Sequence, residues 1–409
     1  MSGKSFSNMD TKIDPERVPS LANKYNCVIK LVITGGGTGG HVFPGVAIAE
    51  ELSARCDLSC LWIGTGRPVE KRALKAKEWG YEILQVRPLK GRDPLNLLGS
   101  LLHLPVSIVR AGLILKRFKP DVVLGVGGYV SGPVLAAASL MHIPTVIHEQ
   151  NLLPGLANKL ASRFANKIFT SFEASKLHFK NNAIECLGNP VRRQILRQGT
   201  TSSTAKPRNG ALHILILGGS QGASGLNRLA ASALEILQQS GHKFQAIHQT
   251  GPHDYTEMKT FYKRAGMDVA VHEFINEMGI AYSWTDLIIC RAGATTLAEI
   301  TAIGRPAICI PYPYSADGHQ GLNAKAISDA GAGLYFEEGD VGAVRLASEI
   351  EKLMSDPDRL AEMTRRAKSL GRPEAAVEIA ESILSLCHKG SQGELFIKRN
   401  RGETVHSNV

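Results

Sequence analysis

Short apolar runs that end in glycine-rich turns recur along this chain and restrict its fold more than any other feature. The run 28–33 ends in the turn 34–40, and the run 212–217 ends in the turn 218–223. A helical pattern follows each turn, so each segment is typical of a strand, a tight turn and a helix. Backbone N–H groups at such a turn point at the space above the sheet, where the helix dipole adds positive potential. The repetition predicts two similar halves with anionic ligands between them.

Apolar runs alternate with longer helical patterns almost throughout the chain. The run 121–126, which has no polar residue after Asp121, indicates a sheet covered on both faces, and the alternation favours parallel strands joined by right-handed crossovers. We therefore predict an α/β protein with two doubly wound, Rossmann-like domains that face a cleft. The predicted strands lie near 28–33, 58–63, 82–86, 121–126, 144–147, 167–170, 212–217, 244–248, 269–272, 286–290, 306–310 and 333–336. The predicted helices include 42–54, 95–118, 131–141, 341–354, 357–369 and 374–387.

The chain has 409 residues, which is enough for two domains of ordinary size. Gly188-Asn189-Pro190 follows the last strand of the first half and marks the junction, and 371–373 breaks the helical pattern near the end. We expect the final helix to pack back on the first domain. The expected domains are 27–189 with helix 373–388, and 190–371, flanked by disordered tails at 1–26 and 389–409.

Composition excludes several classes of protein. The seven cysteines form no C-x-x-C pair, which favours a reduced cytosolic protein over a disulfide scaffold, and no metal-ligand spacing is visible. The polar segment 1–26 lacks the apolar core of a secretory signal, and no apolar run is long enough to span a bilayer. We expect a soluble or peripheral protein that requires no metal or other cofactor.

Positive charge is concentrated in one segment. The formal net charge is +10, and residues 84–119 hold seven basic side chains against one acid. Such a segment favours an anionic partner: nucleic acid, acidic lipid headgroups or a phosphorylated substrate. Its apolar residues fit either a buried crossover helix or a helix lying on a membrane. In the second case the membrane face comprises Leu97, Leu98, Leu101, Leu102, Arg110, Lys116 and Arg117.

The first turn formally matches the dinucleotide fingerprint Gly-x-Gly-x-x-Gly. That fingerprint expects an acid at the end of the next strand, and neither 61–64 nor 247–249 contains one. We therefore favour phosphate or pyrophosphate binding over NAD or FAD, with a purely conformational turn as the alternative. His41 begins the following helix and is either a general base or a capping and packing residue.

Further polar motifs follow predicted strands, at the sheet edge where open α/β proteins bind ligands. They are the glycine turn 124–133 and the polar segments 148–151, 291–299 and 311–324. In the third, Glu299 lies one turn into a helix and could accept hydrogen bonds from ribose hydroxyls, or could simply favour the helix N-terminus. Each motif alone also fits ordinary loop polarity.

Together, and in this order, the motifs resemble those of the MurG family, the peripheral membrane glycosyltransferases of peptidoglycan synthesis. The resemblance runs from about Val28 to about Cys387. It implies a GT-B fold and transfer of N-acetylglucosamine from UDP-N-acetylglucosamine to the 4-hydroxyl of the muramoyl sugar of lipid I. The product would be lipid II, formed with inversion.

The resemblance also assigns roles to individual residues, with His41 as our hypothesis for the catalytic base. Ala292 and His319 depart from the family pattern, which more often has serine and glutamine there. The implied donor-binding residues are Thr38, Gly39, Gly40, Asn151, Arg192, Ser220, Ile275, Ala294, Thr295, Thr296, Leu297, Ala298, Glu299, His319 and Gln320. The implied acceptor-binding residues are Gly36, Gly37, Gly127, Gly128 and Tyr129.

The implied location is the cytoplasmic face of the plasma membrane, with an anionic membrane surface and other cell-wall synthesis proteins as partners and no nucleic acid. Two alternatives stay open. One is a GT-B enzyme that acts on a different lipid acceptor. The other is a non-catalytic basic scaffold at a membrane surface, which would need the charge of 84–119 but no polar cleft.

Overall fold

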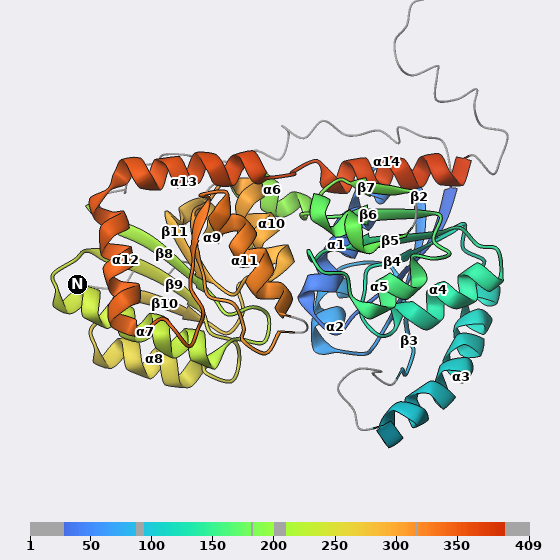
Figure 1. Cartoon of the computed structure of the whole chain (residues 1–409), viewed down its shortest axis with the longest axis horizontal. Helices are drawn as coiled ribbons and strands as arrows, with labels where there is room; N and C mark the ends of the chain where they lie inside the picture. The colour runs from blue at the N-terminus through green and yellow to red at the C-terminus, as the bar shows by residue number, and fades with distance from the viewer. Residues whose placement is uncertain (1–27, 87–93, 181–182, 200–209, 316–317, 389–409) are drawn as a thin grey trace, which may run out of the picture.

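The computed structural model describes residues 28–86, 94–180, 183–199, 210–315 and 318–388, with side chains except those of 94–102 and 388. Two sheets lie next to each other, and helices pack on both faces of each (Figure 1). The first has the order β3-β2-β1-β4-β5-β6-β7 and the second the order β10-β9-β8-β11-β12-β13. Every strand pair is parallel. The predicted fold, two doubly wound α/β domains, is confirmed.

The strands of the two sheets are close to the predicted runs. The first sheet contains β1 (Val28–Thr34), β2 (Asp57–Gly64), β3 (Gly80–Ile83), β4 (Val122–Gly125), β5 (Thr145–Glu149), β6 (Lys167–Thr170) and β7 (Ile184–Cys186). The second contains β8 (Leu212–Leu217), β9 (Phe244–Gln249), β10 (Val269–His272), β11 (Leu287–Cys290), β12 (Ala307–Cys309) and β13 (Gly333–Tyr335).

Helices connect and cover these strands. Those of the first half are α1 (Gly39–Ser53), α2 (Pro68–Leu74), α3 (Pro94–Phe118), α4 (Ser131–Leu140), α5 (Leu156–Ala161), the 3₁₀ helix η3 (Glu173–His178) and α6 (Arg193–Gly199). Those of the second half are α7 (Ser224–Gln239), α8 (Tyr255–Arg264), α9 (Met278–Trp284), α10 (Ala294–Ile303), α11 (His319–Asp329), α12 (Ala343–Ser355), α13 (Pro357–Leu370) and α14 (Ala375–His388).

The strand order places the ligand-binding edge of each sheet. In the first sheet β1 lies between β2 and β4, so the chain leaves β1 and β4 in opposite directions. In the second sheet β8 lies between β9 and β11 in the same way. A crevice opens outside the carboxyl ends of strands at such a reversal. The glycine-rich turns follow these central strands.

Helix α14 is the last helix of the described chain, yet it packs on the first domain. Its Ile379 and Ile383 are buried in one apolar cluster with Leu31 of β1 and Val46 of α1. Figure 1 shows α13 over the second sheet and α14 over the first. The chain therefore crosses between the domains twice.

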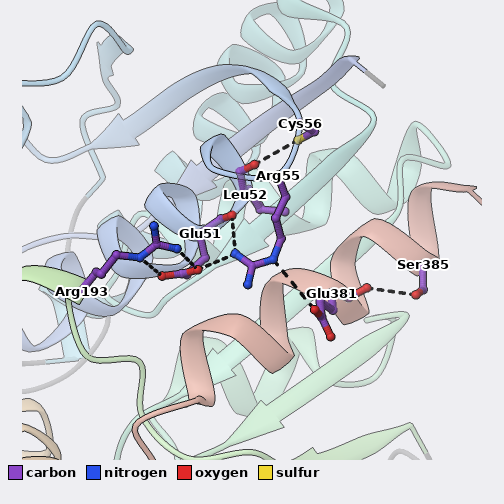
Figure 2. Close-up of polar contacts among 7 residues, drawn as sticks. All are labelled: Glu51, Leu52, Arg55, Cys56, Arg193, Glu381 and Ser385. Carbon is purple, nitrogen blue, oxygen red and sulfur yellow. Dashed lines mark hydrogen bonds and ion pairs between the residues drawn. The ribbon is translucent and has the colours of Figure 1, made fainter. Parts of the chain in front are cut away.

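An ionic cluster around the buried Glu51 connects the two domains near this crossing (Figure 2). The carboxylate of Glu51, on α1, accepts hydrogen bonds from Arg193 Nε at 2.9 Å and from Arg55 Nη1 at 2.5 Å. Arg55 Nε also lies 3.9 Å from Glu381 of α14. Burial alone would raise the pKa of Glu51, but hydrogen bonds from Arg193 and Arg55 outweigh it and lower the pKa. Glu51 thus links α1 directly to α6, where the second domain begins.

The differences from the predicted elements are local. The first helix starts at Gly39, three residues before the predicted start, because Thr38 already has the extended backbone of an N-cap. The short elements α2, α5, η3 and β7 were not predicted, since runs this short carry little periodicity. Within the described ranges, no helix is both long enough and apolar enough to cross a bilayer.

Candidate functional site

A cleft of about 1580 Å³ lies between the two sheets, with residues of both domains on its walls. The first domain contributes the turns 36–40 and 127–129, and the second contributes the turn 218–222. The first residues of α1, α7 and α10 all line the cleft, as does Gly132 at the start of α4. Helix N-termini carry unpaired N–H groups and positive dipole potential. This convergence favours a ligand with negative charge in the cleft.

His41 lies in the first turn of α1, on the cleft wall. Its Nδ1 is 3.1 Å from the carbonyl oxygen of Gly36. A carbonyl can only accept, so Nδ1 carries the proton and Nε2 is the basic nitrogen. Burial lowers the pKa of His41, the Gly36 carbonyl opposes this, and nearby His319 lowers it further. The imidazole is therefore neutral at pH 7 and able to accept a proton.

The two glycine turns of the first domain pack directly on each other, and this contact requires glycine. Gly127 and Gly128 have φ of 96° and 85°, which side-chain-bearing residues rarely adopt. A Cβ on Gly127 would lie 2.8 Å from Cδ2 of His41, and one on Gly128 would lie 2.8 Å from the carbonyl oxygen of Gly36. The turn after β4 thus holds the turn after β1 and the ring of His41 in place.

Arg192 and Glu299 meet on the second domain's wall of the cleft. The guanidinium of Arg192 lies over the ring of Phe43 at 4.1 Å and its Nη2 lies 3.5 Å from Oε1 of Glu299. Tyr282 donates to the other oxygen of Glu299 at 2.9 Å. Burial raises the pKa of Glu299, which Arg192 partly offsets. The pair brings a cation and a hydrogen-bond acceptor to the same wall.

Direct contacts between the domains border the cleft. Thr295 of α10 donates from Oγ1 to the carbonyl oxygen of Gly40 at 3.0 Å. Asn323 of α11 accepts from the backbone N–H of Leu152 at 3.3 Å, and its amide lies 3.4 Å from Oδ1 of Asn151. Residues predicted to bind the donor from opposite domains are therefore within reach of one ligand.

Most of the sequence-predicted site residues line this one cleft. From the first domain these are Gly36, Gly37, Thr38, Gly39, Gly40, His41, Gly127, Gly128, Tyr129 and Asn151. With the second domain come Arg192, Ser220, Ile275, Ala294, Thr295, Thr296, Glu299, His319 and Gln320.

Leu297 and Ala298 are different, because neither lines the cleft. Leu297 is buried in an apolar cluster and Ala298 packs against it. The helical period turns these two positions of α10 away from the face that carries Thr296 and Glu299. Their side chains therefore do not face the cleft, and the prediction that Leu297 and Ala298 bind the donor stays a prediction that concerns their backbone at the start of α10.

The polar segment 148–151 is mostly structural. His148 and Gln150 are buried, and they bond to the carbonyl oxygens of Gly188 and Val126 at 3.1 and 3.0 Å. Glu149 is 2% exposed and burial raises its pKa. Asn151 alone is partly exposed.

Sequence reasoning missed Glu70, the buried carboxylate beneath the first glycine turn. Glu70 is on α2, is fully buried, and accepts from the N–H of Gly37 at 2.9 Å. Thirty-three residues separate these partners, so no local pattern connects them. The available signal is a single acid in the first turn of a helix that follows a strand end.

In the part of α3 whose side chains are described, residues 103–118, one face is buried and the other is exposed. Ala111 and Leu115 are buried, whereas Val109 and Leu113 are 64% and 63% exposed. Of the predicted membrane face, Arg110 and Lys116 are exposed, and exposed Arg117 forms an ion pair with Glu82. The side chains of Leu97, Leu98, Leu101 and Leu102 lie outside the described residues.

No group of three or more His, Cys, Asp or Glu side chains with metal-binding geometry occurs in the described part of the chain. Helix N-termini and the side chains of Arg192 and Arg291 line the cleft and contribute positive potential to it.

Comparison with known proteins extends these observations. The family models of the glycosyltransferase family 28 N-terminal and C-terminal domains match residues 31–170 and 213–379. The chain is 42% identical over 360 residues to the UDP-N-acetylglucosamine–N-acetylmuramyl-(pentapeptide) pyrophosphoryl-undecaprenol N-acetylglucosamine transferase of Myxococcus xanthus, covering 88% of this chain and 93% of the relative. The protein of the same name from Geobacter sulfurreducens is 41% identical over 362 residues, covering 88% and 100%.

Solved structures agree. MurG of Acinetobacter baumannii aligns with a TM-score of 0.69 and 29% identity, covering 87% of this chain and 99% of that one. A UDP-N-acetylglucosamine 2-epimerase aligns with a TM-score of 0.61 and 17% identity, covering 89% and 97%, and shows the shared fold alone. On the strength of its fold, its two matched domains and these relatives, the chain belongs to the MurG family of glycosyltransferases.

Proposed function

We propose that this protein transfers N-acetylglucosamine from UDP-N-acetylglucosamine to lipid I and so forms lipid II. One observation carries the proposal: glycine-rich turns and helix N-termini of both domains converge on a single cleft of about 1580 Å³. Such a cleft suits two diphosphate-bearing substrates. Relatives that are 41–42% identical over 88% of the chain bear the name of this transferase.

The donor binds mainly to the second domain. Its uracil lies beside Ile275, and Glu299 accepts hydrogen bonds from the ribose. The diphosphate lies at the N-terminus of α10, close to Arg192 and Ser220. The sugar lies between His319 and Gln320 on one wall and Thr38, Gly39, Gly40 and Asn151 on the other.

The acceptor binds to the first domain, along the turns 36–40 and 127–129. The N–H of Gly37 already donates to Glu70. Gly37 therefore serves the conformation of the turn and does not donate to the acceptor. Other N–H groups of these turns hold the acceptor diphosphate.

The reaction is a single displacement. His41 Nε2 takes the proton of the acceptor 4-hydroxyl as that oxygen bonds to the anomeric carbon, and the bond from this carbon to the UDP oxygen breaks. Attack opposite the leaving group inverts the anomeric centre. The α10 N-terminus and Arg192 stabilise the charge that develops on UDP. Because the α10 N-terminus and Arg192 stabilise this charge, the proposed mechanism requires no cofactor.

The purified protein should incorporate labelled N-acetylglucosamine from its UDP conjugate into lipid I, and other prenyl or sterol acceptors should stay unlabelled. Labelling of a different lipid in preference to lipid I would favour the alternative GT-B activity. Absence of both labelling and a UDP-induced rise in melting temperature would leave only the scaffold interpretation.

Glu299→Ala should raise the KM for the donor roughly tenfold or more, because a hydrogen bond to a charged group is lost. Glu299→Gln keeps the volume and should show a smaller rise. Steady-state kinetics over donor concentration measure both, with the exposed Glu257→Ala as the control in the same domain. An unchanged donor KM in Glu299→Ala would remove Glu299 from the ribose site.

We infer that the protein works as a peripheral protein at the cytoplasmic membrane surface, held there by α3. Charge reversal at Arg110, Lys116 and Arg117 should weaken binding to anionic vesicles about a hundredfold or more, since each basic residue near such a surface contributes about 1 kcal/mol. Vesicle co-sedimentation measures this. The same reversal at the exposed Lys259, Lys263 and Arg264 of α8 is the control. Equal effects of the two triple variants would place the membrane contact elsewhere.

A further inference from the structure

Hydrogen bonds connect His41 to the buried carboxylate of Glu70 through the Gly36–Gly37 peptide. Its Nδ1 donates to the carbonyl oxygen of Gly36 at 3.1 Å. The N–H of Gly37 donates to Oε1 of Glu70 at 2.9 Å. The Gly36 carbonyl and the Gly37 N–H belong to one peptide group. A buried carboxylate, one peptide and the imidazole therefore form a continuous hydrogen-bonded chain.

Glu70 carries a negative charge that no cation neutralises among the contacts of the described residues. Five hydrogen bonds reach its carboxylate, from the N–H groups of Gly37, Thr65 and Gly66 and the hydroxyls of Thr65 and Tyr81, at 2.5–3.0 Å. Burial alone would raise the pKa of Glu70, but hydrogen bonds from Thr65, Gly37 and Tyr81 outweigh it and lower the pKa. Since every partner is a neutral dipole, the charge polarises the groups that donate to it.

Polarisation passes through the peptide to the histidine. A charge that attracts the Gly37 N–H moves electron density toward the Gly36 oxygen, and hydrogen bonds in series strengthen one another in a buried setting. A more negative Gly36 oxygen holds the proton on Nδ1 more firmly and stabilises the imidazolium that forms when Nε2 takes a proton. Aspartate does the same by direct contact in the serine protease triad.

We propose that Glu70 is a positioning residue for the transfer reaction, acting on His41 through the Gly36–Gly37 peptide to fix its tautomer and raise its basicity. This rests on the proposed role of His41 as the base. Glu70 lies in the first turn of α2 and reaches this peptide through the Gly37 N–H.

Other groups also face this chain, and their effects differ in sign. His319 of α11 lowers the pKa of His41. The hydroxyl of Thr38 lies 3.4 Å from Nδ1 of His41 and is neutral. On the other side, Tyr81 of β3 donates to Oε2 of Glu70 at 2.8 Å and draws off part of its charge. Among these groups, Glu70 is the one that carries a negative charge and so favours a protonated His41.

The test is Glu70→Gln in the full-length protein, with the pKa and tautomer of His41 followed by NMR of labelled histidine. Loss of the charge should lower the pKa of His41 by roughly 0.5–1 unit, less than the 1–3 units that a directly contacting charge produces. The acid limb of kcat/KM should move to lower pH by the same amount. The value of kcat should fall roughly tenfold, part of the 10²–10⁴ of full proton transfer. An unchanged His41 pKa in folded Glu70→Gln overturns the proposal.

Tyr81→Phe gives a milder variant with the opposite sign. Without the tyrosine hydroxyl the carboxylate keeps more charge for Gly37, so the pKa of His41 should rise. Should Glu70→Gln not fold, this rise alone supports the proposal and its absence overturns it. A purely structural role would lower activity in both variants without moving the pKa in opposite directions.

Glu50→Gln is the matched control, since Glu50 is on α1 and pairs with Lys77 at 2.6 Å. It should leave the pKa of His41 unaltered. The His41 titration needs no substrate, so it tests the link to Glu70 even if His41→Ala turns over normally. That second result would contradict the base role in the proposed function and not this coupling.

Discussion

His41→Ala should lower kcat by roughly 10²–10⁴, the usual contribution of a positioned general base. The imidazole is neutral, its Nε2 is free of the Gly36 carbonyl, and it lies on the wall of the cleft between the domains. The donor KM should change little, because the second domain supplies most donor contacts. Steady-state kinetics with lipid I separate the two parameters.

The pH profile gives a second measure of the same role. Burial lowers the pKa of His41 below 6.5, so the basic form persists to lower pH than in a free histidine. The wild-type kcat/KM should therefore begin to fall only below pH 6.5, and His41→Ala should lack this limb. His242→Ala, which removes a ring that lies 3.1 Å from Glu351 and outside the cleft lining, is the matched control and should behave as wild type. Near-native turnover in His41→Ala would end the assignment.

Glu51→Ala should lower the free energy of unfolding by about 3 kcal/mol. Removing one partner of a buried ionic cluster typically costs about 3–5 kcal/mol, because the remaining charges lose their partner. The lower end applies here since the side chain of Arg193 is 28% exposed, compared with 11% for Arg55. Urea denaturation at pH 7 measures the loss. The exposed Asp329→Ala, at an ion pair with Lys325, should change the value by no more than about 0.5 kcal/mol.

The pH dependence of this loss follows from the sign of the shift. The pKa of Glu51 is lower in the folded protein than its ordinary value of 4.5. Its contribution is therefore complete above pH 4.5 and disappears as the pH falls through the folded-state pKa. The difference between wild type and Glu51→Ala should shrink below pH 4.5. An equal difference at pH 7 and at acid pH would show that lost packing, not lost charge, destabilises the variant.

The sequence predicted those features that depend on local pattern. The apolar runs located the central strands, as with β1 and β8, because a buried parallel strand is apolar along its whole length. The glycine turns after these strands located the cleft. The short β7 and α2 lacked such a pattern and were missed.

The supporting groups could not be predicted, because each depends on a partner far along the chain. Glu51 meets Arg193 across 142 residues, and Asn323 meets Leu152 across 171. Leu297 was predicted to bind the donor because it stands inside a motif, yet its helix turns it into the core. Motifs identify a segment, and only the folded helix determines which of its side chains faces the ligand.

The structure of the protein in complex with UDP-N-acetylglucosamine tests the central claim most directly, namely that one cleft between two parallel sheets binds the nucleotide sugar. We expect uracil beside Ile275, the diphosphate at the N-terminus of α10 and the sugar between Gln320 and the glycine turn 36–40. Nucleotide bound outside this cleft, or a diphosphate remote from α10, would contradict the account.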